Sequence, residues 1–133
     1  MLVLLDPLRE FTLMTVFLRL FLAALFGACI GLERGMRHHA AGFRTYSIVC
    51  IGAASVMLLS QYLLLTFGSG DPSRMGAQVI SGIGFLGAGT ILITGHSRGQ
   101  RVKGLTTAAG LWSAACMGLA IGASVGMALA PKK

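Results

Sequence analysis

Four long apolar stretches, separated by short polar connections, constrain the fold of this 133-residue chain more than any other feature. A helix needs about 20 mostly apolar residues to cross the hydrocarbon core of a bilayer. Backbone N–H and C=O groups find no water there, so a spanning segment satisfies them internally as a helix. The sequence therefore predicts an all-α membrane protein, a bundle of four transmembrane helices over residues 11–32, 46–67, 75–93 and 105–122.

The composition agrees with a lipid environment. Hydrophobic residues make up 55% of the chain and charged residues 11%, and the mean hydropathy is +0.79. Soluble domains carry about 25% charged residues, so a water-soluble fold of this composition would expose large apolar patches. No repeat of 20–50 residues and no linker divides the chain. We therefore expect a single transmembrane domain over residues 1–133.

Basic residues gather in two of the connections between the apolar stretches. Residues 33–45 carry three arginines and one glutamate, and residues 95–104 carry two arginines and one lysine with no acid. Cytoplasmic loops of membrane proteins are enriched in Lys and Arg. Both connections are therefore expected inside the cell and the N-terminus outside, with Phe43 and Tyr46 at the inner membrane interface.

Small residues recur at helical spacing in three of the four stretches. They are Ala23, Gly27, Gly31 and Gly35 along the first stretch and just beyond it, Ala77, Ser81, Gly84 and Ala88 in the third, and Ala114, Gly118, Gly122 and Gly126 along the fourth and just beyond it. Small residues on one face let helix backbones approach closely in lipid. We expect these faces to pack within one chain, and the alternative is self-association or docking on another membrane protein.

Arg19 is the one ionisable residue well inside a predicted span. A charge at the bilayer centre costs about 2.5–3.5 kcal/mol on insertion scales, so something should compensate it. One interpretation is that the side chain snorkels to the outer headgroups. The other is a buried partner, for which Asp71 and Gln78 in the third stretch are the candidates.

Polar residues also mark the ends of the predicted helices. Asp71 followed by proline is typical of a helix start, with the carboxylate capping free N–H groups. Glu33 can pair with Arg37 or Arg44 at the inner side, although an exposed pair contributes little stability. The start of the fourth helix at residues 104–107 lies beside basic residues, which either anchor the helix or bind an anion such as a lipid headgroup.

Several classes of function lack a supporting motif. The basic residues lie in short loops between spans, which argues against nucleic-acid binding. No nucleophile–base–orienter set is recognisable, so an enzyme is not expected. The glycine-rich run at 81–89 follows no strand and precedes no lysine, so it is expected to pack closely or to kink a helix rather than to bind phosphate.

Histidines and cysteines give no metal, cofactor or disulfide pattern. The histidines are His38, His39 and His96, and the cysteines are Cys29, Cys50 and Cys116. Adjacent histidines without a cysteine or acidic cluster are weak metal ligands, and the cysteines have no paired spacing. The cysteines are expected to be buried as small apolar residues. A loose lipobox at residues 26–29 offers a lipoprotein signal as an alternative to the first span.

The order of the motifs resembles the membrane domain of the MgtC/SapB family of bacterial inner-membrane proteins. The matching segments are GLER at 31–34 after the helix containing Arg19, AGFRT at 41–45, DPSR at 71–74, the run from Ala77 to Gly89, GLTTAA at 104–109, and Trp112. Together they cover most of residues 17–122. The run with Gln78 and the GLTTAA block are the most specific of them.

The resemblance implies a multi-pass protein of the bacterial inner membrane that modulates membrane partners or ion homeostasis under magnesium limitation, with a link to virulence in some pathogens. The alternative is a subunit of a Mg²⁺ transporter or channel. Larger members carry a fifth helix and often a soluble cytoplasmic domain. Here the last apolar stretch, 123–130, is too short to span and extends the fourth helix or forms the stub of a fifth.

The candidate functional or helix-contact residues combine the polar positions near the spans with the small-residue face of the third stretch. They are Arg19, Glu33, Arg34, Arg44, Asp71, Arg74, Gln78, Ser81, Gly84, Ala88, Thr106 and Thr107. The expected partners are the lipid bilayer and other membrane proteins or a second copy of the chain. No catalytic residue, cofactor, metal site or nucleic-acid partner is predicted.

Overall fold

A computed structural model describes residues 12–94 and 104–124 of the chain and contains four α-helices in these ranges. They are α1 (Leu13–Met36), α2 (Phe43–Phe67), α3 (Pro72–Thr94) and α4 (Leu105–Ala123). All four are long and apolar enough to cross a membrane, and the described residues contain no strand. The predicted all-α bundle of four spans is confirmed.

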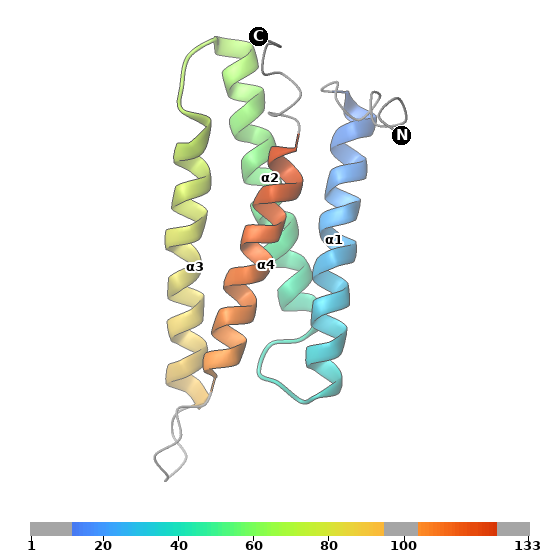
Figure 1. Cartoon of the computed structure of the whole chain (residues 1–133), viewed down its shortest axis with the longest axis vertical. Coiled ribbons are helices and arrows are strands. Elements are labelled where there is room, and N and C mark those ends of the chain that lie inside the picture. The colour runs from blue at the N-terminus through green and yellow to red at the C-terminus, as the bar shows by residue number, and fades with distance from the viewer. Residues whose placement is uncertain (1–11, 95–103, 125–133) are drawn as a thin grey trace.

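The helices form a bundle in which α2 and α4 lie between α1 and α3 (Figure 1). α2 contacts all three other helices, α4 contacts them as well, and α3 packs on α4 and α2. The helix ends next to the two basic connections, at Met36, Phe43, Thr94 and Leu105, all lie at one end of the bundle. This grouping is the one predicted, while the assignment of that end to the cytoplasm stays a prediction from the positive-inside rule.

The helices extend up to four residues beyond the predicted spans. α1 continues to Met36 rather than residue 32, and α2 and α3 begin at Phe43 and Pro72, each three residues early. Hydropathy marks the residues in lipid, whereas a helix can continue through the headgroups, where its polar side chains are solvated. Residues 125–130 of the predicted stub lie outside the described residues.

Glycines on α1 bring that helix into backbone contact with α2. A Cβ atom built on Gly27 would lie 2.7 Å from the Tyr46 carbonyl oxygen, and one built on Gly31 would lie 2.6 Å from the Phe43 Cα. Only glycine fits at such distances. The prediction of packing within the chain is confirmed for this part of the α1 face, although Gly35 is exposed with open space around it.

Glycines on α4 do the same on the other side of α2. A Cβ atom on Gly118 would collide with the Cys50 carbonyl oxygen and lie 2.9 Å from the Ala53 Cβ. A Cβ atom on Gly122 would lie 2.7 Å from the Ala54 carbonyl oxygen. The α4 face therefore packs within the chain as predicted, and Gly126 lies outside the described residues.

The small-residue face of α3 is different, and the prediction of intrachain packing is wrong there. Its four members, Ala77, Ser81, Gly84 and Ala88, are all exposed, which in a membrane means facing lipid. α3 instead buries Gly76, Ile83 and Gly87. A helix at the edge of a bundle buries one narrow face, and the spacing of small residues alone does not say which face that is. α3 is also a continuous helix through residues 81–89, so the glycine-rich run does not break it.

Tyr46, near the inner end of α2, is fully buried inside the bundle, whereas Phe43 is exposed. Its hydroxyl donates a hydrogen bond to the Thr107 carbonyl oxygen on α4, at 3.4 Å. Gly110, which has no Cβ, leaves the space that the phenol ring fills. The ring thereby ties the inner ends of α2 and α4 together. Among the cysteines, Cys50 is buried as predicted, whereas Cys29 is exposed on α1, contrary to the prediction.

Candidate functional site

Three consecutive backbone carbonyls at the C-terminal end of α4 accept hydrogen bonds from side chains. The Gly122 oxygen accepts from Arg19 at 3.3 Å, and the Ala123 oxygen accepts from Gln61 at 3.2 Å. The Ile121 oxygen accepts from the hydroxyl of Ser124 at 2.7 Å. The last four carbonyls of an α-helix have no partner within the helix, so these side chains satisfy groups that would otherwise face hydrocarbon.

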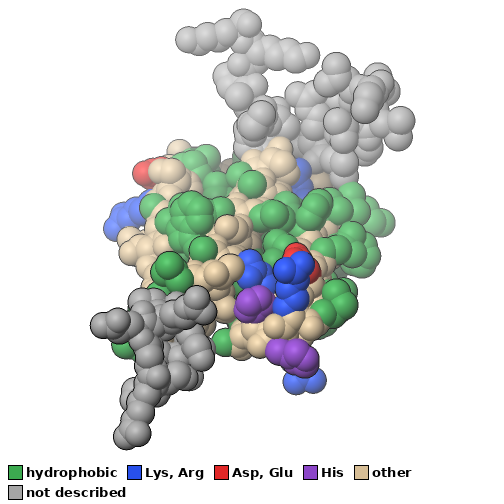
Figure 2. Space-filling view, turned by 60° about the horizontal axis from the view of Figure 1, so that its bottom comes forward, with side chains coloured by type: hydrophobic (Ala, Val, Ile, Leu, Met, Phe, Trp, Pro, Cys, Tyr) green, Lys and Arg blue, Asp and Glu red, His purple; other side chains and the backbone are tan. Residues whose placement is uncertain are grey.

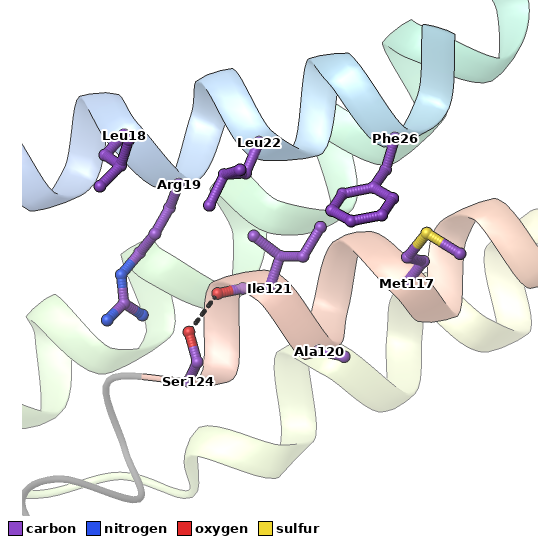
Figure 3. Close-up of a pocket in the computed structure, with 8 residues that line it drawn as sticks. All are labelled: Leu18, Arg19, Leu22, Phe26, Met117, Ala120, Ile121 and Ser124. Carbon is purple, nitrogen blue, oxygen red and sulfur yellow. Dashed lines mark hydrogen bonds between the residues drawn. The ribbon is translucent and has the colours of Figure 1, made fainter. Parts of the chain in front are cut away.

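Arg19 reaches this position from α1 and is 5% exposed. It lies six residues after Leu13, about 9 Å along the helix. Figure 3 shows its side chain extending from α1 toward the end of α4. The guanidinium places a positive charge at the negative end of the α4 dipole, which is a favourable arrangement. Snorkelling to the outer headgroups, one of the two interpretations from sequence, does not match this buried position.

The partners proposed from sequence for Arg19 are also wrong. Asp71 and Gln78 are both exposed on the α3 side of the bundle, whereas Arg19 Nη1 donates a hydrogen bond to a backbone carbonyl of α4. Sequence reasoning considered side chains as partners. The C-terminal end of a helix inside the membrane also carries a partial negative charge, which comes from its backbone carbonyls and is not marked by any particular residue type.

Gln61 is the residue that the sequence analysis missed. It lies six residues before Phe67, the end of α2, at nearly the same distance from the outer end as Arg19 has on α1. It is 5% exposed. The signal was present in the sequence, because two polar residues at matching depth on neighbouring spans are expected to share a partner.

An apolar groove of about 480 Å³ runs between α1 and α4 beside Arg19 (Figure 3). Most of its lining is hydrocarbon. The lining residues are Leu18, Arg19, Leu22 and Phe26 from α1, Met117, Ala120 and Ile121 from α4, and Ser124. Mg²⁺ requires several oxygen ligands, usually with carboxylates, and this groove presents only the Ser124 hydroxyl among the side chains that line it.

Asp71 caps the start of α3 as predicted. Its carboxylate accepts hydrogen bonds from the Ser73 backbone N–H at 2.9 Å and from the Ser73 hydroxyl at 2.6 Å. These bonds, together with the charge of Arg74, hold the pKa of the exposed Asp71 carboxyl below its usual value. Arg74 is itself exposed one turn into the helix.

The opposite end of the bundle carries the basic candidates. Glu33 pairs with Arg37 at 3.4 Å, one of the two pairings considered from sequence, and both side chains are largely exposed. Arg44 is exposed and Arg34 is partly buried. Figure 2 shows basic and histidine side chains gathered at this end. The pair contributes little stability because water surrounds it.

The start of α4 is only partly accessible for the predicted anion contact. Thr106 is exposed, but Thr107 is buried against α2 through its contact with Tyr46. The neighbouring Arg101, Lys103 and His96 lie outside the described residues. Among the described residues, no three His, Cys, Asp or Glu side chains come together as a metal site would require.

Comparison with known proteins identifies the family. The family model described as "MgtC family" matches residues 20–130. The chain belongs to the MgtC family. The resemblance seen in the motifs is thereby confirmed. The matched region begins one residue after Arg19 and contains the rest of α1 and all of α2, α3 and α4.

Relatives in this family come from several bacteria. The protein named "Putative magnesium transporter YhiD" of Escherichia coli K12 is 44% identical over 113 residues, which are 81% of this chain and 51% of the relative. Protein MgtC of Brucella abortus is 46% identical over 103 residues, 77% of this chain and 40% of the relative. Protein MgtC of Salmonella typhimurium is 46% identical over 105 residues, which are 79% of this chain and 42% of the relative. The chain thus spans about half or less of each relative's length, and no solved structure matches it.

MgtC-family membership and the four apolar helices make this chain a multi-pass protein of the bacterial inner membrane. The bilayer is therefore its surrounding medium. Of the candidate residues, Arg19 alone lies at the polar contacts at the end of α4. Six others are exposed on α3 or at its start, namely Asp71, Arg74, Gln78, Ser81, Gly84 and Ala88. The structure leaves the basic residues of the inner end apart from both.

Proposed function

We propose that this MgtC-family protein modulates other membrane proteins or ion homeostasis under magnesium limitation, and that it acts through contacts between helices rather than by catalysis or transport. In pathogens this role would support survival at low magnesium. The polar groups inside the bundle support the proposal. Arg19 and Gln61 donate to α4 carbonyls and so hold three helices together, which leaves them engaged in structure rather than along a path for ions.

The positions of the described carboxylates support the same proposal. Glu33 lies at the inner end of α1 and Asp71 at the outer start of α3, so neither lies at hydrocarbon depth. Mg²⁺ dehydrates reluctantly and usually needs carboxylate oxygens. A buried arginine would also repel a divalent cation. A route for Mg²⁺ through the described part of the bundle would therefore lack ligands and meet a positive charge.

The alternative function is a subunit of a Mg²⁺ transporter or channel. The name of the Escherichia coli relative, "Putative magnesium transporter YhiD", favours it. Backbone carbonyls can serve as cation ligands where a helix is interrupted, but α3 is continuous through its glycine-rich run. The alternative therefore rests on the name of a relative of which this chain matches 51%.

Flux measurement separates the two functions. Purified protein is reconstituted into liposomes that contain a Mg²⁺-sensitive dye, with empty liposomes and ionophore-treated liposomes as the two references. The proposal predicts that liposomes containing the protein take up Mg²⁺ no faster than empty liposomes. Saturable influx above that level would establish transport and end the proposal.

A growth experiment tests the positive half of the proposal. Cells that lack the protein are compared with wild-type cells at low and high external Mg²⁺, and total cellular Mg²⁺ is measured in both. We expect slower growth at low Mg²⁺ only, with unchanged Mg²⁺ uptake. Equal growth at both concentrations would contradict a role in magnesium limitation.

A further inference from the structure

The face of α3 that points away from the bundle carries polar groups at hydrocarbon depth. Arg74, Gln78, Ser81 and Phe85 follow one another at spacings of four, three and four residues, so they share one side of the helix. All four are exposed, and Phe85 is 83% exposed. We call these four residues the outer face of α3. At 100° per residue it lies about 170° from the buried residues Gly76, Ile83 and Gly87.

Two of these polar groups lie in the lipid. Gln78 and Ser81 are six and nine residues after Pro72, about 9 and 14 Å along the helix. Both are exposed. Lipid tails offer an amide no hydrogen-bond partner, and an unsatisfied polar group there is costly. By contrast, the buried Gln61 on α2 donates to a carbonyl of its own chain.

Glycines flank the outer face of α3 on both sides. Cβ atoms built on Gly82, Gly84 and Gly89 would meet nothing within 4 Å. Four glycines of α1 and α4 lie against the backbone of α2, whereas a Cβ atom on any of these three would meet no described residue within 4 Å; the four are Gly27, Gly31, Gly118 and Gly122. The small-residue pattern of α3 thus lacks within this chain the contact that the same pattern makes on the other helices.

We propose that the outer face of α3 is a self-association surface on which a second copy of the chain docks in parallel, so that Gln78 of each copy hydrogen-bonds to Gln78 of the other. All copies insert into the membrane in the same orientation. A twofold axis along the membrane normal therefore sets each residue of α3 opposite its own counterpart at equal depth. A glutamine amide contains both a donor and an acceptor, so it is complementary to itself.

Charge favours the same occupant. Asp71 and Arg74 carry opposite charges, lie at the outer start of α3 and are both exposed. They are three residues apart and so lie on nearly the same side as Gln78. In a parallel twofold pair, Asp71 of each copy can pair with Arg74 of the other, which offsets the repulsion between the two Arg74 side chains that the axis brings to equal depth. A different membrane protein would have to supply both charges and an amide at matching depths. This inference is independent of the proposed function, since a transporter and a modulator can both self-associate.

Energy transfer between labelled copies in liposomes tests the surface. Cys29 is first replaced by Ala, and donor and acceptor dyes are attached through His39→Cys in the loop between α1 and α2. Energy transfer is followed as lipid dilutes the protein. We expect Gln78→Leu to raise the dissociation constant about 5- to 30-fold, the range for membrane hydrogen bonds in model peptides. If the labelled protein with the native Gln78 gave only the energy transfer expected for random encounters, the proposal would be overturned.

A matched pair of serine variants controls for position. Ser81 lies on the outer face of α3, and Ser55 is another exposed serine, in the middle of α2. Ser81→Leu is expected to weaken self-association, and Ser55→Leu to leave it unchanged. Neither serine is buried, so both variants should keep the unfolding temperature of the parent protein. Equal effects of Ser81→Leu and Ser55→Leu would place the contact elsewhere and overturn the proposal. The proposal would also be overturned if neither Ser81→Leu nor Gln78→Leu weakened self-association.

Oxidative cross-linking gives a readout that does not depend on a loss of function. Ser81→Cys and Ser55→Cys are compared in liposomes in the Cys29→Ala background. A parallel pair through α3 brings the two copies of residue 81 together, so a disulfide-linked dimer should form much faster for Ser81→Cys. Equal rates for the two variants would contradict the arrangement, even if the protein self-associates by another face or binds a different membrane protein.

Discussion

Arg19 and Gln61 show how polar residues in an apolar chain acquire a structural role. Each donates to a carbonyl at the end of α4, where the backbone has acceptors that the helix cannot use. That Arg19 needs compensation could be predicted from the sequence, because a charge in lipid is costly. Its partner could not be predicted, because a backbone carbonyl is common to every residue and depends on where a neighbouring helix ends.

Replacing Arg19 with Leu should therefore destabilise the folded bundle by about 1 to 2 kcal/mol, through loss of a charged donor to a buried carbonyl. The measurement is equilibrium unfolding in mixed detergent micelles at increasing fractions of a denaturing detergent. Arg44→Leu, at an exposed position of α2, is the control and should change the free energy of unfolding by about 0.5 kcal/mol or less. An unchanged or higher stability for the Arg19 variant would show that the hydrogen bond to Gly122 has no energetic role.

At the scale of the helices, one sequence pattern has two outcomes. Small residues four apart on α1 and α4 lie in backbone contact with α2, whereas those on α3 face outward. The pattern predicts that a helix can be approached closely, but it does not identify the approaching helix. That choice depends on the arrangement of the bundle, with α2 in the middle and α3 at the edge, which hydropathy does not encode.

The glycine contacts can be tested by adding one methyl group. Gly118→Ala would push a Cβ into the backbone of α2 at Cys50, and we expect a loss of about 1 to 3 kcal/mol of stability from overpacking. Gly52→Ala is the matched control, because a Cβ there meets nothing within 4 Å and alanine favours the helix. Its stability should be unchanged or higher. Equal stability of the two variants in the same micelle assay would refute the close contact between α2 and α4.

For the whole molecule, hydropathy and charge predicted much of the architecture. The four apolar stretches became four helices, and the helix ends next to the two basic connections lie at the same end of the bundle. These features follow from lipid as the solvent, which acts on each segment separately. The order of the helices in the bundle and the polar contacts at the end of α4 depend on several segments together, so they required the structure.

The central claim is that the chain crosses the membrane on these four helices with its basic loop inside the cell. The most direct measurement is labelling of single introduced cysteines in intact cells with a membrane-impermeant thiol reagent, after Cys29 and Cys116 are replaced by Ala. Ser69→Cys lies between α2 and α3 and His39→Cys between α1 and α2. We predict rapid labelling of residue 69 in intact cells and labelling of residue 39 only after the membrane is permeabilised. Labelling of both residues in intact cells, or of residue 39 alone, would contradict the claim.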